Sequence, residues 1–302
     1  MKAILVSQYG GPEVMQFADC PDPSPGLDEV LVRVAATSIN PFDMKRRSGE
    51  AKAFAPISFP GILGVDLAGT VINCGPQVKG FSAGDRVFGM ADQTYAELCL
   101  AKAENLAKIP AGLDLVEAAA LPVVTTTGYQ LIANGAPVQR GQSVLVTGAL
   151  GSVGRAAVFA AKSRGARVIA GVRKKQLEQA VALGVDGVVA IDDQDAVANL
   201  QMLDAVADTV DGITSELLIG KVKAGGIFAS VLGAPPNSAD HASVKVVPVF
   251  GRSDTKALLE MAKAVVEGRL AIPIAAKKPL KDAGAAHDLV AKGINGKVLL
   301  VP

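Results

Sequence analysis

Three glycines in the segment SVLVTGALGSVGRAA, residues 143–157, have the spacing of a phosphate-binding loop. Gly148, Gly151 and Gly154 stand between an apolar run that predicts a strand and a small-residue run that predicts a helix. Glycines let a phosphate-bearing ligand approach the backbone where a Cβ would block it, and the last one allows close packing of helix on strand. The helix N-terminus adds free N–H groups and a positive dipole end. The segment therefore predicts a dinucleotide pyrophosphate site, although its spacing is G-x-x-G-x-x-G rather than the usual G-x-G-x-x-G.

The residues after the next predicted strand indicate which dinucleotide binds. Sites for NAD usually carry Asp or Glu there, which holds the ribose 2′-hydroxyl. This chain has no acid in that segment and three cations, in the run Gly171, Val172, Arg173, Lys174, Lys175. A carboxylate would repel a 2′-phosphate, whereas a guanidinium binds it through paired charge-assisted hydrogen bonds. We therefore expect NADPH to be preferred over NADH, with Arg173 and Lys174 as contacts, while Lys175 is as readily explained as a solvated residue.

These loops need a parallel sheet to hold them, and the second half of the chain predicts one. Short apolar runs alternate with helical runs from the strand at 143–147 to VKVVPVF at 244–250. This rhythm is typical of βαβ units in a doubly wound α/β sheet. The first 110 residues contain instead short strands closed by Gly, Pro or Asp, as in an all-β unit. We expect a Rossmann dinucleotide-binding domain at residues 122–252 and a β-rich domain at residues 1–121, to which residues 253–302 return.

Composition excludes several other classes of protein. Among the 302 residues half are hydrophobic, and the net charge of +1 comes with no basic stripe of the kind that nucleic acids require. The cysteines, Cys20, Cys74 and Cys99, form neither a disulfide framework nor a CxxC pair. No run approaches the roughly 20 apolar residues of a membrane span, and the N-terminal apolar run is too short for a signal peptide. We expect a cytoplasmic protein without nucleic-acid or membrane partners.

Six segments occur in the order of a known family. They are INPFDMKRRSG, PGILGVDLAGTV, GFSAGDRVFGM, TYAELCLA, AAALPVVTTTGYQLI and GKVLLVP. The chain resembles the zinc-free quinone oxidoreductase and enone oxidoreductase branch of the medium-chain dehydrogenase/reductase superfamily over nearly its whole length. The resemblance implies a GroES-like β domain on the substrate side, a Rossmann domain, and a cleft between the two.

The resemblance also implies that no metal is bound. Zinc-dependent members of the superfamily carry Cys where this chain has Asn40 and His where it has Val65, together with a lobe of four cysteines that is missing here. His241 and His287 lie outside every motif. The chain thus offers no set of His and thiolate ligands of the kind that zinc prefers.

Without a Lewis acid, reduction of an activated double bond is the chemistry that demands least of the protein. Hydride would pass from nicotinamide C4 to a quinone or to the β-carbon of an enone, and the protein would orient both π systems and stabilise the enolate. The resemblance implies that Asn40 faces the nicotinamide ribose or the substrate carbonyl and that Lys45 donates to the developing oxyanion. A surface lysine is the alternative for Lys45, and its neighbours Arg46 and Arg47 are expected to be solvated.

Further cofactor contacts follow from the same resemblance, with Thr127 at the nicotinamide end. The others belong to the glycine loop and to two later strand ends: Gly148, Ala149, Leu150, Gly151, Ser152, Val153, Leu232, Gly233, Phe250 and Gly251. Phe250 is equally well explained as a core residue. Asp192 and Asp193 place negative charge near the predicted 2′-phosphate contact, which opposes the preference for NADPH. Ala51 stands where many quinone oxidoreductases carry Tyr, so water is expected to supply the final proton.

The leading prediction is an NADPH-dependent reductase of quinones or α,β-unsaturated carbonyls. One alternative is a reductase of other activated alkenes, such as haloacrylates or acrylyl thioesters. Another is a non-catalytic NADPH-binding sensor, and a third is an enoyl reductase partner in polyketide chemistry. Family habit further implies a homodimer, formed through the sheet edge near residues 244–250.

Overall fold

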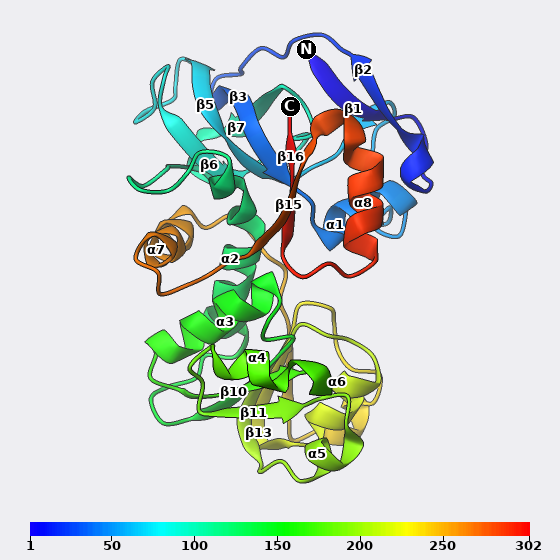
Figure 1. Ribbon diagram of the computed structural model, residues 1–302, viewed down its shortest axis with the longest axis vertical. Helices are drawn as coiled ribbons and strands as arrows, with labels where there is room; N and C mark the ends of the chain where they lie inside the picture. Colours follow the sequence, from blue (N-terminus) through cyan, green and yellow to red (C-terminus); the bar gives the residue numbers. More distant parts are fainter. The chain divides into compact units, whose positions relative to one another are not determined.

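The computed structural model describes all 302 residues, which form two compact units. Unit 1 comprises Met1–Val123, Ser253–Gly268 and Ile272–Pro302, and unit 2 comprises Val124–Arg252 and Arg269–Ala271. In Figure 1 most of unit 1 has blue, cyan, orange and red colours, and unit 2 runs from green to yellow. None of the helices combines the length and the hydropathy that crossing a membrane demands.

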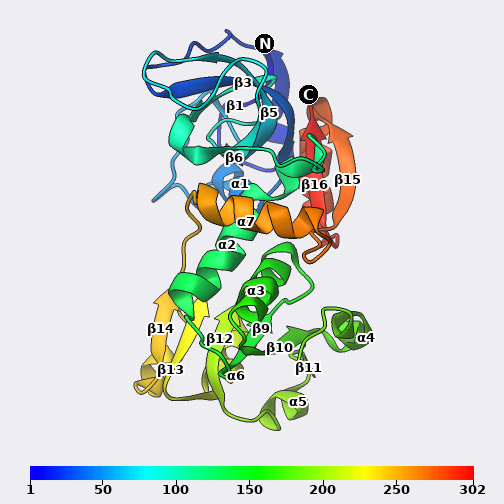
Figure 2. The ribbon, with the colours of Figure 1, turned by 90° about the vertical axis from the view of Figure 1, so that its left-hand side faces the viewer.

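Unit 2 contains a parallel sheet of six strands in the order β11-β10-β9-β12-β13-β14 (Figure 2). The strands are β9 (Ser143–Thr147), β10 (Arg167–Val172), β11 (Gly187–Ala190), β12 (Leu203–Asp208), β13 (Val222–Ser230) and β14 (Lys245–Pro248). After β9 the chain forms β10 and β11 on one side of that strand, and it then crosses to form β12 on the other side. This reversal creates the switch point at which α/β sheets bind ligands, outside the carboxyl ends of the strands. The predicted doubly wound sheet is confirmed.

Five helices accompany this sheet. They are α2 (Pro122–Gln130), α3 (Ser152–Ser163), α4 (Leu177–Val181), α5 (Gln194–Ala198) and α6 (Ile213–Ile219). The small residues of α3 let it pack closely on β9 and β10, since Ala156, Ala157 and Ala160 are buried on one face. Buried apolar side chains on both faces explain why the central strands are runs of Val, Leu and Ala rather than alternating sequences.

Unit 1 is the β-rich unit, as expected from the short strands at the start of the chain. One sheet has the order β15-β16-β3-β5-β6-β8 with β7 paired to β3, and a smaller sheet has the order β2-β1-β4. The strands are β1 (Lys2–Val6), β2 (Met15–Asp19), β3 (Glu29–Ser38), β4 (Gly61–Ile62), β5 (Asp66–Cys74), β6 (Arg86–Met90), β7 (Leu98–Lys102), β8 (Leu106–Lys108), β15 (Ile274–Pro279) and β16 (Lys297–Val301). The helices are α1 (Pro41–Ser48), α7 (Thr255–Val266) and α8 (Ala283–Ala291).

The C-terminal strand returns to the segment that carries the predicted catalytic residues. In β16, Leu299 pairs with Ser38 of β3 in an antiparallel ladder, immediately before α1 begins. Figure 1 shows the last strand, in red, beside β3, in blue. This pairing places Lys297, at the start of β16, close to Asn40.

A buried histidine connects α8 to α1. His287 has no exposed surface, and its ring nitrogens lie 3.1 Å from Arg47 Nη1 and 3.1 Å from Tyr95 Oη. Because a guanidinium can only donate, Nδ1 of His287 accepts from Arg47, and Nε2 carries the ring proton toward Tyr95. Burial, together with the charge of Arg47, lowers the pKa of His287 to about 3. The imidazole therefore stays neutral in the folded protein.

This histidine should make unit 1 sensitive to acid. Below pH 6.5 the unfolded chain protonates His287 while the folded chain does not, so between pH 7 and pH 4.5 the residue should cost about 1–3 kcal/mol of stability. Relative to wild type, the variant His287→Gln should therefore gain in Tm as the pH falls from 7 to 4.5, measured by calorimetry at both pH values. A Tm difference that is the same at both would contradict a neutral buried imidazole.

Candidate active site

The loop between β9 and α3 depends on its glycines for local reasons that differ. Gly148 has a φ of +57°, and a Cβ there would lie 2.5 Å from Thr209 Oγ1. A Cβ on Gly154 would lie 2.2 Å from Gly148 O, so only glycine lets α3 approach the loop this closely. A Cβ on Gly151 would meet nothing nearer than Gly148 O at 3.1 Å. Gly151 is thus the glycine of this loop with the most open space beside it.

The start of α3 offers unused N–H groups. Its first helical hydrogen bond runs from Arg155 N to Gly151 O at 2.8 Å. The N–H groups of Ser152, Val153 and Gly154 come before it and have no acceptor within the helix. Such groups and the helix dipole together favour an anion. Ala149 and Leu150 are buried, so neither of these predicted contacts offers an exposed side chain to a ligand.

Three exposed cations follow β10, and their partners distinguish them. The Nζ atom of Lys174 lies 2.9 Å from Asp193 Oδ2, and its N–H donates to Asp192 Oδ1 at 2.7 Å. Arg173 donates from Nε to Gln176 Oε1 at 3.3 Å, and no acid forms an ion pair with its guanidinium. Both acids that seemed to oppose a 2′-phosphate are therefore bound to Lys174, which leaves Arg173 with its charge unpaired.

The end of β10 and the glycine loop are tied together through the backbone. Ala149 N donates to Gly171 O at 3.2 Å, and Ile191 N donates to Val172 O at 2.9 Å. Gly171 and Val172 are both buried, and a Cβ on Gly171 would lie 2.9 Å from Ile191 Cγ2. Gly171 and Val172 therefore maintain the backbone shape of the strand end. Arg173 is the first residue after them whose side chain is exposed.

Two residues predicted at the nicotinamide end lie against each other. A Cβ on Gly251 would lie 2.3 Å from Thr127 Oγ1, so only glycine allows the chain to pass this hydroxyl so closely. The side chain of Gln130 holds the backbone next to Gly251 in place, because it donates to Arg252 O and accepts from Arg252 N, both at 3.0 Å. The neighbouring Phe250 is 72% exposed, so its interpretation as a core residue is wrong.

Leu232 and Gly233 form the turn after β13. Leu232 N donates to Ser230 Oγ at 3.0 Å, and Gly233 has a φ of +114°. Leu232 is 44% exposed, which leaves its side chain accessible. The hydroxyl of Ser230 also donates to Asp208, a buried carboxylate at the end of β12. No role for Asp208 was predicted from the sequence. The only signal for it was an acid that closes the apolar run LDAVAD.

In unit 1 a buried lysine holds Asn40 at the start of α1. Lys297 Nζ donates to Asn40 Oδ1 at 2.7 Å and to Ile39 O at 3.0 Å. Asn40 Nδ2 donates to Asp66 Oδ2 at 2.8 Å and to Ser38 O at 3.4 Å. Both amide hydrogens are therefore used inside unit 1, and the side chain is only 2% exposed. This geometry favours a positioning role for Asn40, and its predicted place facing the nicotinamide ribose or the substrate carbonyl stays a prediction.

The two carboxylates near Asn40 belong to the same network, in which both oxygens of Asp66 accept hydrogen bonds and only Asp43 Oδ1 lacks a partner. Asp66 accepts from Ser38 Oγ, from Val123 N at 2.8 Å and from Lys297 Nζ at 3.4 Å. Asp43 Oδ2 accepts from Asn40 N at 2.8 Å, so Asp43 caps α1. Burial raises the pKa of Asp43 to about 7 and lowers the pKa of Lys297. The cluster thus serves to fix the first turn of α1.

Of the three cations on α1, Lys45 alone is exposed and without a side-chain partner. The expectation that Arg46 and Arg47 are solvated is wrong. Arg46 is buried and forms an ion pair with Asp92 at 2.6 Å, and Arg47 donates to His287 and to Gly10 O. The physical reason is that α1 packs one face into unit 1, so that only Lys45 points away from it.

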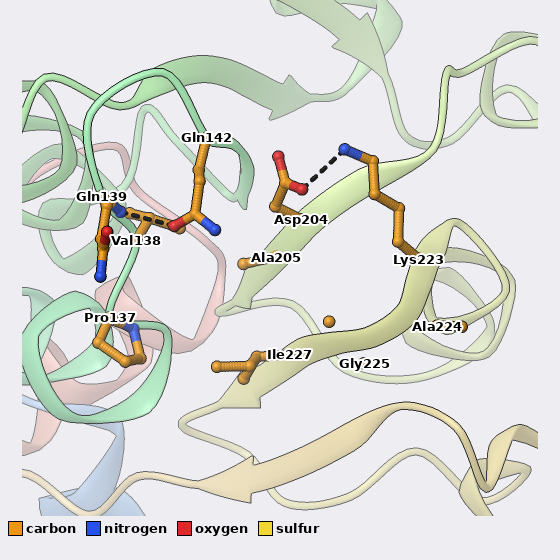
Figure 3. Close-up of a pocket in the computed structure, with 11 residues that line it drawn as sticks. Pro137, Val138, Gln139, Gln142, Asp204, Ala205, Lys223, Ala224, Gly225 and Ile227 are labelled. Carbon is orange, nitrogen blue, oxygen red and sulfur yellow. Dashed lines mark hydrogen bonds and ion pairs between the residues drawn. The ribbon is translucent and has the colours of Figure 1, made fainter.

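No metal site and no cavity elsewhere in unit 2 offers a better candidate than the residues around the glycine loop. No group of three or more His, Cys, Asp or Glu residues is placed to hold a metal ion. A cavity of about 250 Å³ lies at the amino ends of β9, β12 and β13, at the opposite edge of the sheet from the glycine loop (Figure 3). Its charged groups already satisfy each other, since Lys223 Nζ lies 2.7 Å from Asp204 Oδ1. It is therefore a poor site for an anionic ligand.

Comparison with known proteins agrees with this geometry. Residues 26–191 match the family model of the alcohol dehydrogenase GroES-like domain, and residues 183–300 match that of zinc-binding dehydrogenases. The chain is 30% identical to a chloroplast envelope quinone oxidoreductase homolog of Arabidopsis thaliana, over 100% of this chain and 98% of that protein. The residues present do not fit zinc, because Asn40 is hydrogen-bonded to Lys297 and Val65 has no ligand atom.

Solved structures are similar over the full chain. That of Escherichia coli quinone oxidoreductase complexed with NADPH has a TM-score of 0.89 and 27% identity, with 100% of both chains covered. A structure named NAD-dependent alcohol dehydrogenase has a TM-score of 0.89 and 30% identity, again with 100% of both chains covered. Segment order, fold and these similarities agree. The chain is therefore an oxidoreductase that belongs to the quinone oxidoreductase branch of the medium-chain dehydrogenase/reductase superfamily.

Proposed function

We propose that the protein is an NADPH-dependent reductase of quinones or α,β-unsaturated carbonyls. The observation that carries the cofactor assignment is the unpaired Arg173 at the end of β10, next to acids that Lys174 already binds. The similar structures include one complexed with NADPH and one named for NAD, so the preference has to be argued from this strand end. A free guanidinium at that position favours a ligand with a 2′-phosphate.

The residues present fit such a dinucleotide. The free N–H groups of Ser152 and Val153 would bind the pyrophosphate beside Gly151, the least crowded glycine of this loop. Arg173 would bind the 2′-phosphate. The nicotinamide end would be lined by residues that meet at the carboxyl ends of the strands and on α2: Thr127, Leu232, Gly233, Phe250 and Gly251.

NADPH, when bound, supplies the hydride, and the protein's task is to orient the acceptor and to stabilise negative charge on it. We assign the second task to Lys45, whose ammonium is exposed and unpaired while its neighbours Arg46 and Arg47 are engaged elsewhere. Asn40 sets where α1 begins and hence where Lys45 stands. Ala51 is fully buried where many relatives carry Tyr, so no phenol donates there, and water supplies the proton.

We also propose a homodimer that pairs through β14. This strand ends the sheet order and has a neighbour only on the side of β13. An unpaired strand edge is a ready template for pairing with a second chain.

A panel of acceptors should separate the candidate activities. Loss of NADPH absorbance is expected with quinones and with simple enones. No reduction of NADP⁺ is expected with simple alcohols, because oxidation of an alcohol would also need a base to take its proton. Turnover confined to haloacrylates or acrylyl thioesters would favour the alternative alkene substrates. Binding of NADPH without turnover of any acceptor would favour a sensor.

Removal of the free guanidinium should change the cofactor preference. The variant Arg173→Ala should raise the Kd of NADPH by about 10–100-fold, because it loses a charge-assisted contact of about 1.5–3 kcal/mol, and should leave the Kd of NADH nearly unchanged. Both constants are measured by titrating the nicotinamide fluorescence. Lys175→Ala is the matched control, since it removes an exposed positive charge two residues away. Equal weakening of both dinucleotides by Arg173→Ala would contradict the assignment.

Loss of Lys45 should slow turnover and spare cofactor binding. For an oxyanion donor the variant Lys45→Ala should lower kcat with an enone by about 10–100-fold, with the Kd of NADPH unchanged. Lys52→Ala, an exposed lysine in the following segment, serves as the control. Unchanged kcat in Lys45→Ala would show that Lys45 is an ordinary surface lysine with no part in turnover.

A further inference from the structure

We infer that Asp208 is the positioning residue that holds the glycine loop and the Leu232–Gly233 turn in the arrangement that binds the dinucleotide. The inference rests on the proposed function, since it concerns how that cofactor site keeps its shape. Asp208 ends β12, which lies between β9 and β13 in the sheet (Figure 2). The loops after β9 and after β13 contain the predicted pyrophosphate and nicotinamide contacts.

All contacts of the Asp208 side chain come from donors. Oδ1 accepts from Thr147 Oγ1 at 2.9 Å and from Val210 N at 3.2 Å. Oδ2 accepts from Ser230 Oγ at 2.8 Å, with Ser215 Oγ at 3.5 Å. A carboxylate can accept on both of its oxygens, whereas an amide accepts on its oxygen and donates from its nitrogen. The site is thus specific for a carboxylate, and an amide of the same shape would present its NH₂ group to a hydroxyl.

The directions of the hydroxyl protons are fixed from the other side. Thr147 Oγ1 accepts from Thr209 N at 2.7 Å, so its own proton is free to point at Asp208. Ser230 Oγ accepts from Leu232 N at 3.0 Å, and its proton likewise points at Asp208. Two chains of hydrogen bonds therefore end at the same carboxylate. One runs from Leu232 N, in the turn after β13, through Ser230. The other runs from Thr209 N, directly after Asp208, through Thr147, the last residue of β9 before the glycine loop.

The first of these chains also controls the glycine loop. Thr209 Oγ1 donates to Thr147 O at 2.8 Å and lies 2.5 Å from the position that a Cβ on Gly148 would take. The side chain of Thr209 is thereby packed against the first glycine. Asp208 orients Thr147, Thr147 orients Thr209, and Thr209 sets the space in which Gly148 turns.

Stability alone does not explain a charge at this position. Asp208 is 1% exposed and forms no ion pair. A buried carboxylate without an opposite charge carries a desolvation cost that its hydrogen bonds only offset. An apolar residue would suit the end of a buried strand better. What the carboxylate adds is a single acceptor that binds the last residues of β9 and β13 at once, directly before the two loops, at the carboxyl edge of the sheet.

The variant Asp208→Asn tests this inference with folded protein. Because the two loops contact parts that NADPH and NADH share, both Kd values should rise by the same factor, about tenfold, the loss expected for about 1.4 kcal/mol. The preference for NADPH over NADH should therefore stay as in wild type. Circular dichroism and the Tm of the free protein establish that the variant is folded at the assay temperature. Ser215→Ala is the matched control, because it removes only the long contact at 3.5 Å.

The outcomes are distinct. Wild-type Kd values in folded Asp208→Asn would overturn the inference and leave a purely structural carboxylate. A rise for NADPH alone would overturn it as well, since the effect would then act at the 2′-phosphate. If wild type itself binds neither dinucleotide, the proposed function fails, and the inference fails with it.

Should Asp208→Asn not fold, Ser230→Ala and Thr147→Val interrupt one chain each. Each should raise both Kd values by a similar factor in folded protein, and Kd values equal to those of wild type in both variants would overturn the inference.

Discussion

A bound phosphate needs backbone N–H groups that nothing else in the protein uses, and unit 2 is arranged to keep such groups free at the start of α3. The free groups exist because a helix cannot satisfy its own first N–H groups. Glycines shape this helix start, because a Cβ on Gly151 would lie 3.1 Å from Gly148 O and a Cβ on Gly154 only 2.2 Å from the same atom. Parallel strands then bring the later contacts to the same edge of the sheet.

Most buried polar side chains in the two units find a partner inside the fold, and the exceptions are the atoms Asp43 Oδ1, Arg46 Nε and Asn237 Oδ1. In unit 2 the carboxylate of Asp208 is satisfied by hydroxyls and a backbone N–H. In unit 1 Lys297 and Asp66 satisfy the amide of Asn40. In both places the buried group fixes a loop or a helix start that carries exposed residues. The residues that would touch a ligand, Arg173 and Lys45, are in contrast those without charged partners.

The features that could be predicted from the sequence are those that depend on residues close together in the chain. The glycine spacing, the βαβ rhythm and the cations after β10 each involve residues close together in the chain, so that periodicity and spacing were sufficient to predict the Rossmann fold. Lys297 and Asp208 were missed for a physical reason. Lys297 is 257 residues away from its acceptor Asn40, and Asp208 is 61 residues away from Thr147. Arg46 and Arg47 were misjudged for the same reason, because their partners Asp92 and His287 lie on other elements.

The charge balance after β10 shows why composition alone does not determine cofactor preference. The sequence places three cations and two acids near this strand end, so the net local charge is small. The structure pairs these groups unequally, since Lys174 binds both acids, one through its ammonium and one through its backbone N–H. An ion pair between exposed groups is weak, but both acids form their contacts with Lys174 and neither forms one with Arg173. A 2′-phosphate would then meet a guanidinium whose only partner is the neutral Gln176, and electrostatic attraction would favour NADPH at a site whose total charge is nearly balanced.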